Sequence, residues 1–356
     1  MSFETFKKRD CPLYNDFVKN HSNGSALQSW EWGELKEVFG WQVERFGFIE
    51  NNKLIGSVQC LFKKLPFGFK ILYISRGPVI NFKNKNDREN FLIEIKKVAK
   101  EKKADLIRIE PEIIKNAKCK NQNDKTDEIN EENDIMQFFR QNGFKKSKIS
   151  YQPLNTMIVD LKKSEQEIWQ KELNQKARYN TRLSERKGVK IIEDINEKNI
   201  EEFYKLWQKT KVRQDLSIRS EKYYKKLFSI FPKENIHLFL AQYQEKFIAG
   251  LILITFGKKA IYLYAASDYD FHSLMPTYLI VWKAILKAKE KGCEIFDFWG
   301  AAPEKAKKNH PWQGITLFKQ KFCQSRRINY IGAWDMPISW KYWIFIWLEK
   351  INKILH

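Results

Sequence analysis

One predicted helix of this 356-residue chain contains many basic side chains, which could bind phosphate groups. The segment SEQEIWQKELNQKARYNTRLSERKGVKI is typical of a helix that Gly188 ends. Its basic residues are Lys171, Lys176, Arg178, Arg182, Arg186, Lys187 and Lys190. Such a stripe can follow the phosphates of a nucleic acid, although a basic helix is also commonly a solvated surface. The central four, from Lys176 to Arg186, are our candidates for RNA contact.

Two further segments carry groups that could bind an anion or move a proton. In SIRSEKYY, Arg219 and Tyr223 are four residues apart, which would place a guanidinium and a phenol on one helix face. The arginine fork suits bidentate binding of phosphate. In RIEPE, Glu110 ends a predicted buried strand before a proline, so its carboxylate could transfer a proton or tie down a neighbouring turn.

Several familiar chemistries lack their motifs here. The sequence contains no GxxxxGK[ST], no GxGxxG after a predicted strand and no GxSxG elbow. His272 and His310 have no partners at metal-ligand spacing, and the five cysteines form no CxxC pair, so we expect no metal site. The junctions GPVINFKNKND and AASDYDFHSLMP lack the glycine-rich turn that would bind the pyrophosphate of acetyl-coenzyme A, which disfavours that donor.

Composition and charge bound the class of protein. The chain is 43% hydrophobic, which is enough for a core, and its length predicts two domains. The net charge of +21 suits an anionic partner such as nucleic acid, anionic lipid or a phosphorylated substrate, unless much of the lysine excess is merely solvated surface. With no apolar leader, no span of about 20 apolar residues and no disulfide framework, we expect a cytoplasmic protein.

The predicted elements repeat one order twice. Each half shows a strand meander, a helix and a buried strand, which indicates duplication of one α/β unit. The first half also opens on a predicted helix over 4–20 and a second over 31–39, and it contains a predicted exposed loop over 119–134.

Several segments, taken together, resemble the FemABX family of aminoacyl-tRNA-dependent transferases that form peptidoglycan bridges. They are QSWEWGELK, LPFG with YISRGPV, RIEPE, KARYNTRLSERKGV, YLYAASD, MPTYLIVW, FDFWG, and NHPWQGITLFKQKF followed by NYIGAWD. The resemblance covers about residues 27 to 337. It implies two tandem GNAT-like (acyl-CoA N-acyltransferase) α/β domains with mixed central sheets, the second inserted into the first. The implied first domain comprises residues 1–152 plus 320–356, and the second comprises 153–319.

The same resemblance implies the reaction and its partners. The donor would be aminoacyl-tRNA, and the acceptor would be the stem-peptide amine of UDP-MurNAc-pentapeptide or lipid II. No cofactor and no metal would take part, and we expect a monomer. The alternatives are a GNAT-type N-acyltransferase that uses a thioester donor and a non-catalytic RNA-binding protein that explains the charge alone.

Two candidate catalytic residues follow from the resemblance. Lys319 matches the lysine that stabilises the transition-state charge, and the adjacent Phe318 could bind the terminal adenosine or the aminoacyl group. Glu110 occupies the place of a family Asp considered as a base. The alternative for Lys319 is an ordinary surface lysine on a strand.

The remaining candidates would bind the acceptor. Lys36 matches a lysine that binds the acceptor phosphates, although a lysine late in a helix also suits the helix dipole. Arg219, Tyr223 and Tyr264 match further acceptor contacts. Tyr262 and Tyr264 could instead simply alternate between core and solvent. The basic helix lies in the family's RYNxRL segment, which favours contact with aminoacyl-tRNA over a solvated surface.

The C-terminal segment ISWKYWIFIWLEKINKILH predicts an apolar helical stripe with lysines between its members. The stripe comprises Trp340, Trp343, Ile344, Trp347, Leu348, Ile351 and Leu355. One interpretation docks this stripe on the first domain, and the other rests it on the inner face of a membrane as a peripheral contact.

Overall fold

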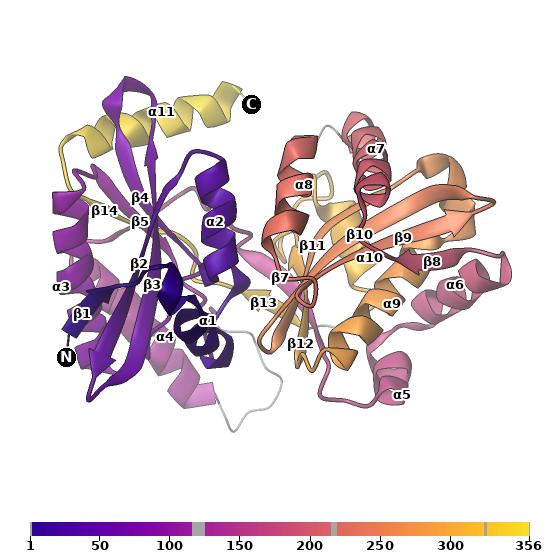
Figure 1. Cartoon of the computed structure of the whole chain (residues 1–356), viewed down its shortest axis with the longest axis horizontal. Helices are drawn as coiled ribbons and strands as arrows, with labels where there is room; N and C mark the ends of the chain where they lie inside the picture. The colour runs from indigo at the N-terminus through magenta and orange to yellow at the C-terminus, as the bar shows by residue number, and fades with distance from the viewer. Residues whose placement is uncertain (1, 116–124, 215–218, 324–325, 356) are drawn as a thin grey trace. The chain divides into compact units, whose positions relative to one another are not determined.

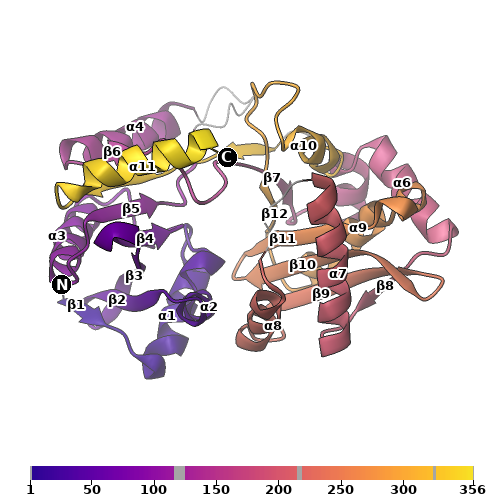
Figure 2. The same ribbon diagram turned by 90° about the horizontal axis from the view of Figure 1, so that it is seen from above.

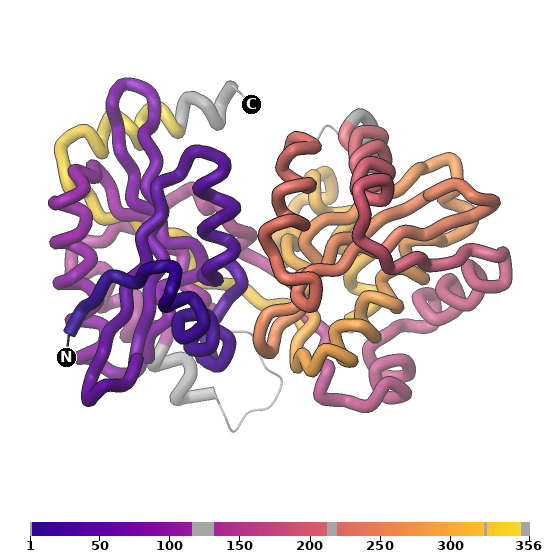
Figure 3. Tube along the Cα trace, viewed as in Figure 1, coloured from indigo at the N-terminus to yellow at the C-terminus, as the bar shows by residue number. Residues whose placement is uncertain are grey.

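The chain folds into two compact units, each built around its own sheet (Figures 1 and 2). The computed structural model describes residues 2–115, 125–214, 219–323 and 326–355, with side chains left out at 125–131, 212–214 and 350–355. Unit 1 comprises Met1–Leu154 and Asn329–His356, and unit 2 comprises Asn155–Ile328. Figure 3 traces this path, with the yellow end of the chain back among the indigo and purple elements. The return comes later than the expected 320 because β13 (Arg327–Asn329) still pairs with the second sheet.

Unit 1 has a seven-stranded mixed sheet in the order β1-β2-β3-β4-β5-β14-β6. Its strands are β1 (Ser2–Thr5), β2 (Gln42–Glu50), β3 (Lys53–Lys64), β4 (Lys70–Ser75), β5 (Leu106–Glu110), β6 (Lys145–Lys146) and β14 (Trp334–Pro337). Its α-helices are α1 (Cys11–Asn20), α2 (Trp30–Val38), α3 (Lys85–Glu101), α4 (Lys125–Gln141) and α11 (Lys341–Leu355).

Side-chain alternation along the strands gives the first sheet two apolar faces. On β5, Ile107 and Ile109 join a core with α3 and α4, whereas Leu106 points to the opposite face. On that opposite face, Leu61, Ile71 and Tyr73 pack with Tyr342 of α11. The sheet is therefore covered on both sides, with helix α11 on one of them.

Unit 2 has a seven-stranded sheet in the order β13-β7-β12-β11-β10-β9-β8. Its remaining strands are β7 (Asn155–Asp160), β8 (Lys190–Glu193), β9 (Ile236–Tyr243), β10 (Lys246–Phe256), β11 (Lys259–Ser267) and β12 (Ile295–Gly300). Its helices are α5 (Glu165–Glu167), a π-helical turn (Ile168–Glu172), α6 (Gln175–Arg186), α7 (Glu197–Gln214), α8 (Glu221–Ile230), α9 (Pro276–Glu290) and α10 (Gln313–Lys319).

The two units repeat one topology, as the sequence predicted. In unit 1 the antiparallel meander β2-β3-β4 is followed by α3 and by β5, which pairs in parallel with β4. In unit 2 the meander β9-β10-β11 is followed by α9 and by β12, which pairs in parallel with β11. A parallel pair needs a crossover, and α3 and α9 supply it. Strands β5 and β12 are thus equivalent positions.

Two predicted elements of unit 1 were wrong. The expected helix over 4–20 is a strand followed by a helix, because Ser2–Thr5 pairs with β2 at the sheet edge before α1 begins at Cys11. The expected loop over 119–134 is helical from Lys125 onward, and Ile135, Phe138 and Phe139 of this helix enter the core. Residues 119–124 lie outside the described part of the chain.

Helix α11 docks on unit 1, but with a different face from the predicted one. Tyr342 is buried on the sheet, and Phe345 and Ile346 pack beside it. Arg108 of β5 donates to Glu349 from Nη1 at 2.8 Å and from Nη2 at 3.0 Å. Trp340, Trp343, Ile344 and Trp347 of the predicted stripe are exposed instead, and the side chains of Ile351 and Leu355 lie outside the described part of the chain.

Candidate active site

Lys319 is the last residue of α10, and its side chain is buried. The Thr316 hydroxyl holds this short helix in place by accepting from the Ala302 amide at 2.8 Å and donating to the Trp312 carbonyl at 2.6 Å. Lys319 Nζ then donates to the Gly300 carbonyl at 2.6 Å, where β12 ends. The alternative of a surface lysine on a strand is wrong, because the residue is helical and only 4% exposed.

Burial sets the electrostatics of Lys319. Loss of solvent lowers the pKa of its ammonium to about 8, and the nearby Asp297 carboxylate opposes part of this change. Its Nζ also lies 5.4 Å from the ring centroid of Tyr262, a cation–π distance. At neutral pH most of the Lys319 population is therefore a cation in a poorly solvated site, which is the kind of group that stabilises a developing oxyanion.

An irregularity at the end of β12 shapes this site. Pairing with β7 loses register between Asp297 and Gly300, and Trp299 adopts a left-handed backbone with φ of 61°. The Asp297 carboxylate accepts from the Trp299 amide at 2.7 Å and from the Thr156 hydroxyl. A bulge of this kind redirects a strand end, and here the redirected Gly300 carbonyl accepts the hydrogen bond from Lys319.

Asp297 of the FDFWG segment is a residue of this site that was not among the predicted ones. An acidic residue inside an otherwise apolar buried strand was the signal that could have identified it.

Phe318 is half-buried beside Lys319. Its ring centroid lies 5.2 Å from that of Tyr278 and 5.3 Å from that of Phe322. The hydroxyl of Tyr278 accepts from Lys321 Nζ at 2.9 Å. Phe318 thus packs partly against the core of unit 2 and leaves the rest of its ring accessible.

A second group of predicted residues gathers where β11 meets α7 and α8. The Tyr264 hydroxyl donates to the Tyr223 hydroxyl at 3.2 Å, and Trp207 and Tyr224 surround the two rings. The Arg219 guanidinium lies 5.6 Å from the Tyr223 ring centroid. Arg219, Tyr223 and Tyr264 therefore form one cluster with a cation at its edge.

Tyr262 and Tyr264 do not follow the simple alternation considered from sequence. Strand β10 pairs Leu253 with Tyr262 and Ile252 with Tyr264, so Leu263 is an extra residue on β11. This bulge sends Tyr262 to the core packed by α9 and leaves Tyr264 against α7 and α8.

Arg219 also departs from its expected place. It lies two residues before α8 begins at Glu221, so it does not share a helix face with Tyr223. The two side chains still meet because the chain entering the helix directs the exposed Arg219 over the ring.

Helix α6 presents three of its four predicted basic residues to solvent. Lys176, Arg182 and Arg186 are exposed, whereas Arg178 Nη1 donates to the Gln170 carbonyl at 3.1 Å and to the Leu173 carbonyl. Arg178 therefore fastens the start of α6 to the preceding π-helical turn. Asn174 caps the helix through its side-chain oxygen, which accepts from the Ala177 amide at 2.8 Å.

One indole extends the basic surface of α6: Trp169 is partly exposed, whereas Trp282 beside it is buried. Arg182 lies 5.3 Å from the Trp169 ring centroid, and the rings of Trp169 and Trp282 are 4.8 Å apart. Together with Glu165, Gln166 and Glu185 these residues line a cavity of about 450 Å³. The lining has two carboxylates against one guanidinium, so only the exposed Arg182 and the partly exposed Trp169 offer a nucleic acid charge and a stacking surface.

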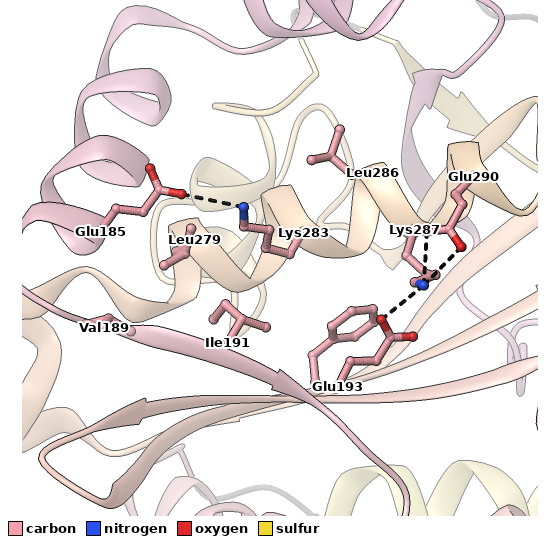
Figure 4. A pocket seen from close by; sticks show the side chains of 10 residues that line it. Glu185, Val189, Ile191, Glu193, Leu279, Lys283, Leu286, Lys287 and Glu290 are labelled. Carbon is pink, nitrogen blue, oxygen red and sulfur yellow. Dashed lines mark hydrogen bonds and ion pairs between the residues drawn. The ribbon is translucent and has the colours of Figure 1, made fainter.

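A second cavity, of about 330 Å³, lies between α6, α9 and the edge of the sheet (Figure 4). Its charged groups pair with one another. Lys287 contacts Glu193 at 3.1 Å and Glu290 at 3.0 Å, and Lys283 contacts Glu185 at 3.6 Å. The lining has three carboxylates and two ammonium groups, so we assign the pocket no role with an anionic substrate.

Lys36 and Glu110 belong to unit 1. Lys36 is half-buried on α2, with its Nζ 4.7 Å from the Trp32 ring centroid. The buried Glu110 accepts from the Tyr151 amide at 2.5 Å, the Gln152 amide at 2.8 Å and the Tyr73 hydroxyl at 3.2 Å. Burial raises the pKa of the Glu110 carboxyl, and these donors oppose the shift. Such contacts favour the interpretation in which Glu110 ties down a turn.

Within the described ranges, no helix has both the length and the apolar character needed to cross a membrane. The same part of the chain contains no group of three or more His, Cys, Asp or Glu residues that could hold a metal ion.

The architecture of the two units is that of tandem GNAT-like proteins. A solved structure described as FemX covers 97% of this chain and 100% of its own chain, with a TM-score of 0.84 and 22% identity. A tandem GNAT protein from the clavulanic acid biosynthesis pathway covers 95% of this chain and 98% of its own, with a TM-score of 0.53 and 8% identity. Both likenesses concern the fold, and they confirm the predicted fold class.

The sequence profile of the FemAB family matches residues 12–246 and 241–350, so the chain belongs to the FemAB family. A lipid II:glycine glycyltransferase from Staphylococcus haemolyticus is 27% identical, covering 86% of this chain and 87% of that protein. A lipid II:glycine glycyltransferase from Staphylococcus aureus strain USA300 is 25% identical, covering 92% of this chain and 91% of that protein. The predicted family is confirmed, and so is the enzyme class: the chain is an aminoacyltransferase.

Proposed function

We propose that this chain transfers an aminoacyl group from aminoacyl-tRNA to the side-chain amine of a peptidoglycan precursor stem peptide, building an interpeptide bridge. The observation that carries the proposal is the buried Lys319 cation at the end of β12, in a member of the FemAB family. The relatives act on lipid II as their names state, which supports a lipid-linked acceptor over the UDP-linked one.

The reaction balances without an added cofactor. The acceptor amine attacks the carbonyl carbon of the aminoacyl ester and forms a tetrahedral oxyanion. Collapse of this species breaks the bond to the tRNA ribose oxygen, which takes up the proton lost by the amine. The products are a new amide and a tRNA with a free terminal hydroxyl.

Placement and charge are the two demands of this reaction. The ester is already reactive, so holding amine and ester together accounts for much of the rate. In our proposal the Lys319 ammonium lies beside the oxyanion and stabilises it, since a preorganised cation in a poorly solvated site is effective there. Phe318 would pack against the terminal adenosine or the aminoacyl group.

The substrates carry phosphates that need separate surfaces. We assign the acceptor phosphates to Lys36 and Arg219, with Tyr223 and Tyr264 contacting the same substrate. We assign the tRNA backbone to Lys176, Arg182 and Arg186, which are exposed on one helix. The position of Arg178 supports a structural role in that surface.

A transfer assay tests the proposal. The enzyme is mixed with a muramyl pentapeptide acceptor and charged tRNA, and mass spectrometry detects addition of an amino acid. Uncharged tRNA should give no product. Lys319→Met should remove most of the activity, and the exposed Lys308→Met is the matched control.

Two outcomes would overturn the proposal. Acylation of an amine from acetyl-coenzyme A, with none from charged tRNA, would identify a thioester-dependent N-acyltransferase. Binding of tRNA without transfer to any muramyl-peptide amine would identify an RNA-binding protein.

A further inference from the structure

Helix α11 carries two apolar stripes. Tyr342, Phe345 and Ile346 form the inner stripe on the first sheet, as described above. The outer face of α11, which we define as Trp343, Ile344 and Trp347 together with Trp340 just before the helix, follows the same spacing on another side. A surface helix of a soluble protein normally has one apolar face, so the second one requires an explanation.

The outer face is accessible to a partner. Trp340 is 71% exposed, Trp343 56%, Ile344 41% and Trp347 60%. Isolated exposed apolar residues are common, but three indoles and an isoleucine in one stripe form a contiguous patch of the kind that marks an interaction site.

The neighbouring turn adds to this surface. Phe67, at the tip of the turn between β3 and β4, is 81% exposed. Phe69 of the same turn lies 6.1 Å from Phe345 of α11, ring centroid to ring centroid, so the turn is adjacent to the helix (Figure 1).

The charges around the outer face are basic. Lys145 Nζ lies 4.0 Å from the Trp343 ring centroid, whereas Lys70 of the turn packs on Phe62 on the opposite face of the sheet. Among the described side chains of α11 and of residues 63–70, the only carboxylate is Glu349, and Arg108 holds it on the inner side. An anionic occupant therefore meets lysine and indole with no opposing negative charge from these segments.

We propose that the outer face of α11 docks on the surface of an anionic lipid bilayer. Indoles place their rings at the boundary between headgroups and acyl chains, and adjacent lysines attract anionic headgroups. A second copy of this chain suits the face less well, because an isologous contact would bring Lys145 of one copy towards the basic surface of the other.

Vesicle binding by the full chain tests this proposal without donor or acceptor. We expect the protein to co-sediment with vesicles of phosphatidylcholine mixed with phosphatidylglycerol, and less with phosphatidylcholine alone. The double variant Trp343→Ser/Trp347→Ser should lower the partition coefficient at least about tenfold, because it removes buried apolar area from the contact. Trp340→Ser, at a residue just before α11, is a second variant and should show a smaller loss.

A matched control separates this face from general hydrophobicity. Leu13 and Ile93 are exposed apolar residues of α1 and α3 in the same unit, at 54% and 51%. Leu13→Ser/Ile93→Ser should bind vesicles as the wild type does. Thermal unfolding of each variant verifies that the fold is intact.

Three results would overturn the proposal. They are absence of wild-type binding to either vesicle, equal binding by the wild type and the tryptophan variants, and a dimer in light scattering that the double variant dissociates. The last result would assign the face to a second copy of the chain. None of them bears on the transfer assay, so the proposed function can stand or fail separately.

One consequence rests on the proposed function. If the acceptor is lipid-linked, Trp343→Ser/Trp347→Ser should lower turnover of lipid II embedded in vesicles. Turnover of the UDP-linked precursor in solution should not change. Equal loss with both acceptors would contradict a role for this face in reaching the membrane.

Discussion

Two buried cations lie at the equivalent strands β5 and β12, Arg108 on β5 itself and Lys319 on α10 beside the end of β12, and their charges are compensated to different extents. On β5, Arg108 donates to both Asp335 oxygens, at 2.7 and 2.8 Å, and also to Glu349. These carboxylates raise the pKa of Arg108 despite its burial. At the end of β12, Lys319 donates to one carbonyl, and burial lowers its pKa to about 8.

This difference indicates that the two copies of the duplicated fold use a buried cation for different purposes. A buried cation with two carboxylate partners is fully compensated and fixes α11 and β14 to the sheet. A buried cation with less compensation is costly to keep, and such groups concentrate where chemistry needs them. Under the proposed function, Arg108 of β5 has a structural role and Lys319 beside the end of β12 belongs to the chemical site.

Arg108→Met should have the largest effect on stability. It leaves the Asp335 carboxylate buried without its partner, which costs about 3–5 kcal/mol of unfolding free energy. Chemical denaturation measures this loss, and the exposed Arg9→Lys in the same unit is the control. A loss of unfolding free energy below about 1 kcal/mol would contradict a structural role for Arg108 on β5.

Glu110→Gln should cost stability rather than chemistry, by about 1–3 kcal/mol. Two backbone amides and one hydroxyl donate to Glu110, and an amide side chain would direct its own N–H groups at some of them. Denaturation and the turnover of the folded enzyme are measured together. Unchanged stability with a large fall in turnover would instead support the base that the family resemblance implied.

The sites beside β5 and β12 show how much of the structure could be predicted from the sequence. The duplicated order of meander, helix and strand was readable because the strands are apolar runs separated by turn residues. The burial of Lys319 could not be predicted from the sequence, because it depends on a seven-residue helix that Thr316 fastens to residue 302. Likewise, the separation of Tyr262 from Tyr264 depends on one bulged residue that no periodicity displays.

The error at α11 has a related cause. The sequence shows an apolar stripe, but both sides of this helix are apolar, so periodicity cannot say which one meets the sheet. Tyr342 and Phe345 face inward because Arg108 draws Glu349, one turn further on, to the same side.

Acceptor binding should respond to Arg219→Lys and Lys36→Met. We expect each to weaken precursor affinity by roughly tenfold in calorimetry, with the larger effect at Arg219 because an ammonium cannot rebuild a bidentate phosphate contact. Lys308→Met serves as control. Wild-type affinity in both variants would remove these residues from the acceptor site.

The basic surface of α6 should control the salt dependence of tRNA binding. Changing Lys176, Arg182 and Arg186 to Glu should raise the apparent dissociation constant for aminoacyl-tRNA. The slope of the logarithm of affinity against the logarithm of salt concentration should fall by about 0.7–0.9 for each lost phosphate contact. Reversing Lys83, Lys85 and Lys96 in unit 1 lowers the net charge equally. Identical slopes in the two triple variants would reject α6 as a tRNA surface.

The most direct test of the chemical site is single-turnover transfer by Lys319→Met across a range of pH. At pH 7 the account predicts a rate roughly 10²–10³ lower than wild type, with precursor affinity mostly intact. The pKa of Lys319 is about 8, so its ammonium is present below that pH and is lost above it. The advantage of the wild type over the variant should therefore shrink as pH rises through 8. Near-wild-type turnover in the variant, or a constant ratio across this range, would contradict the account.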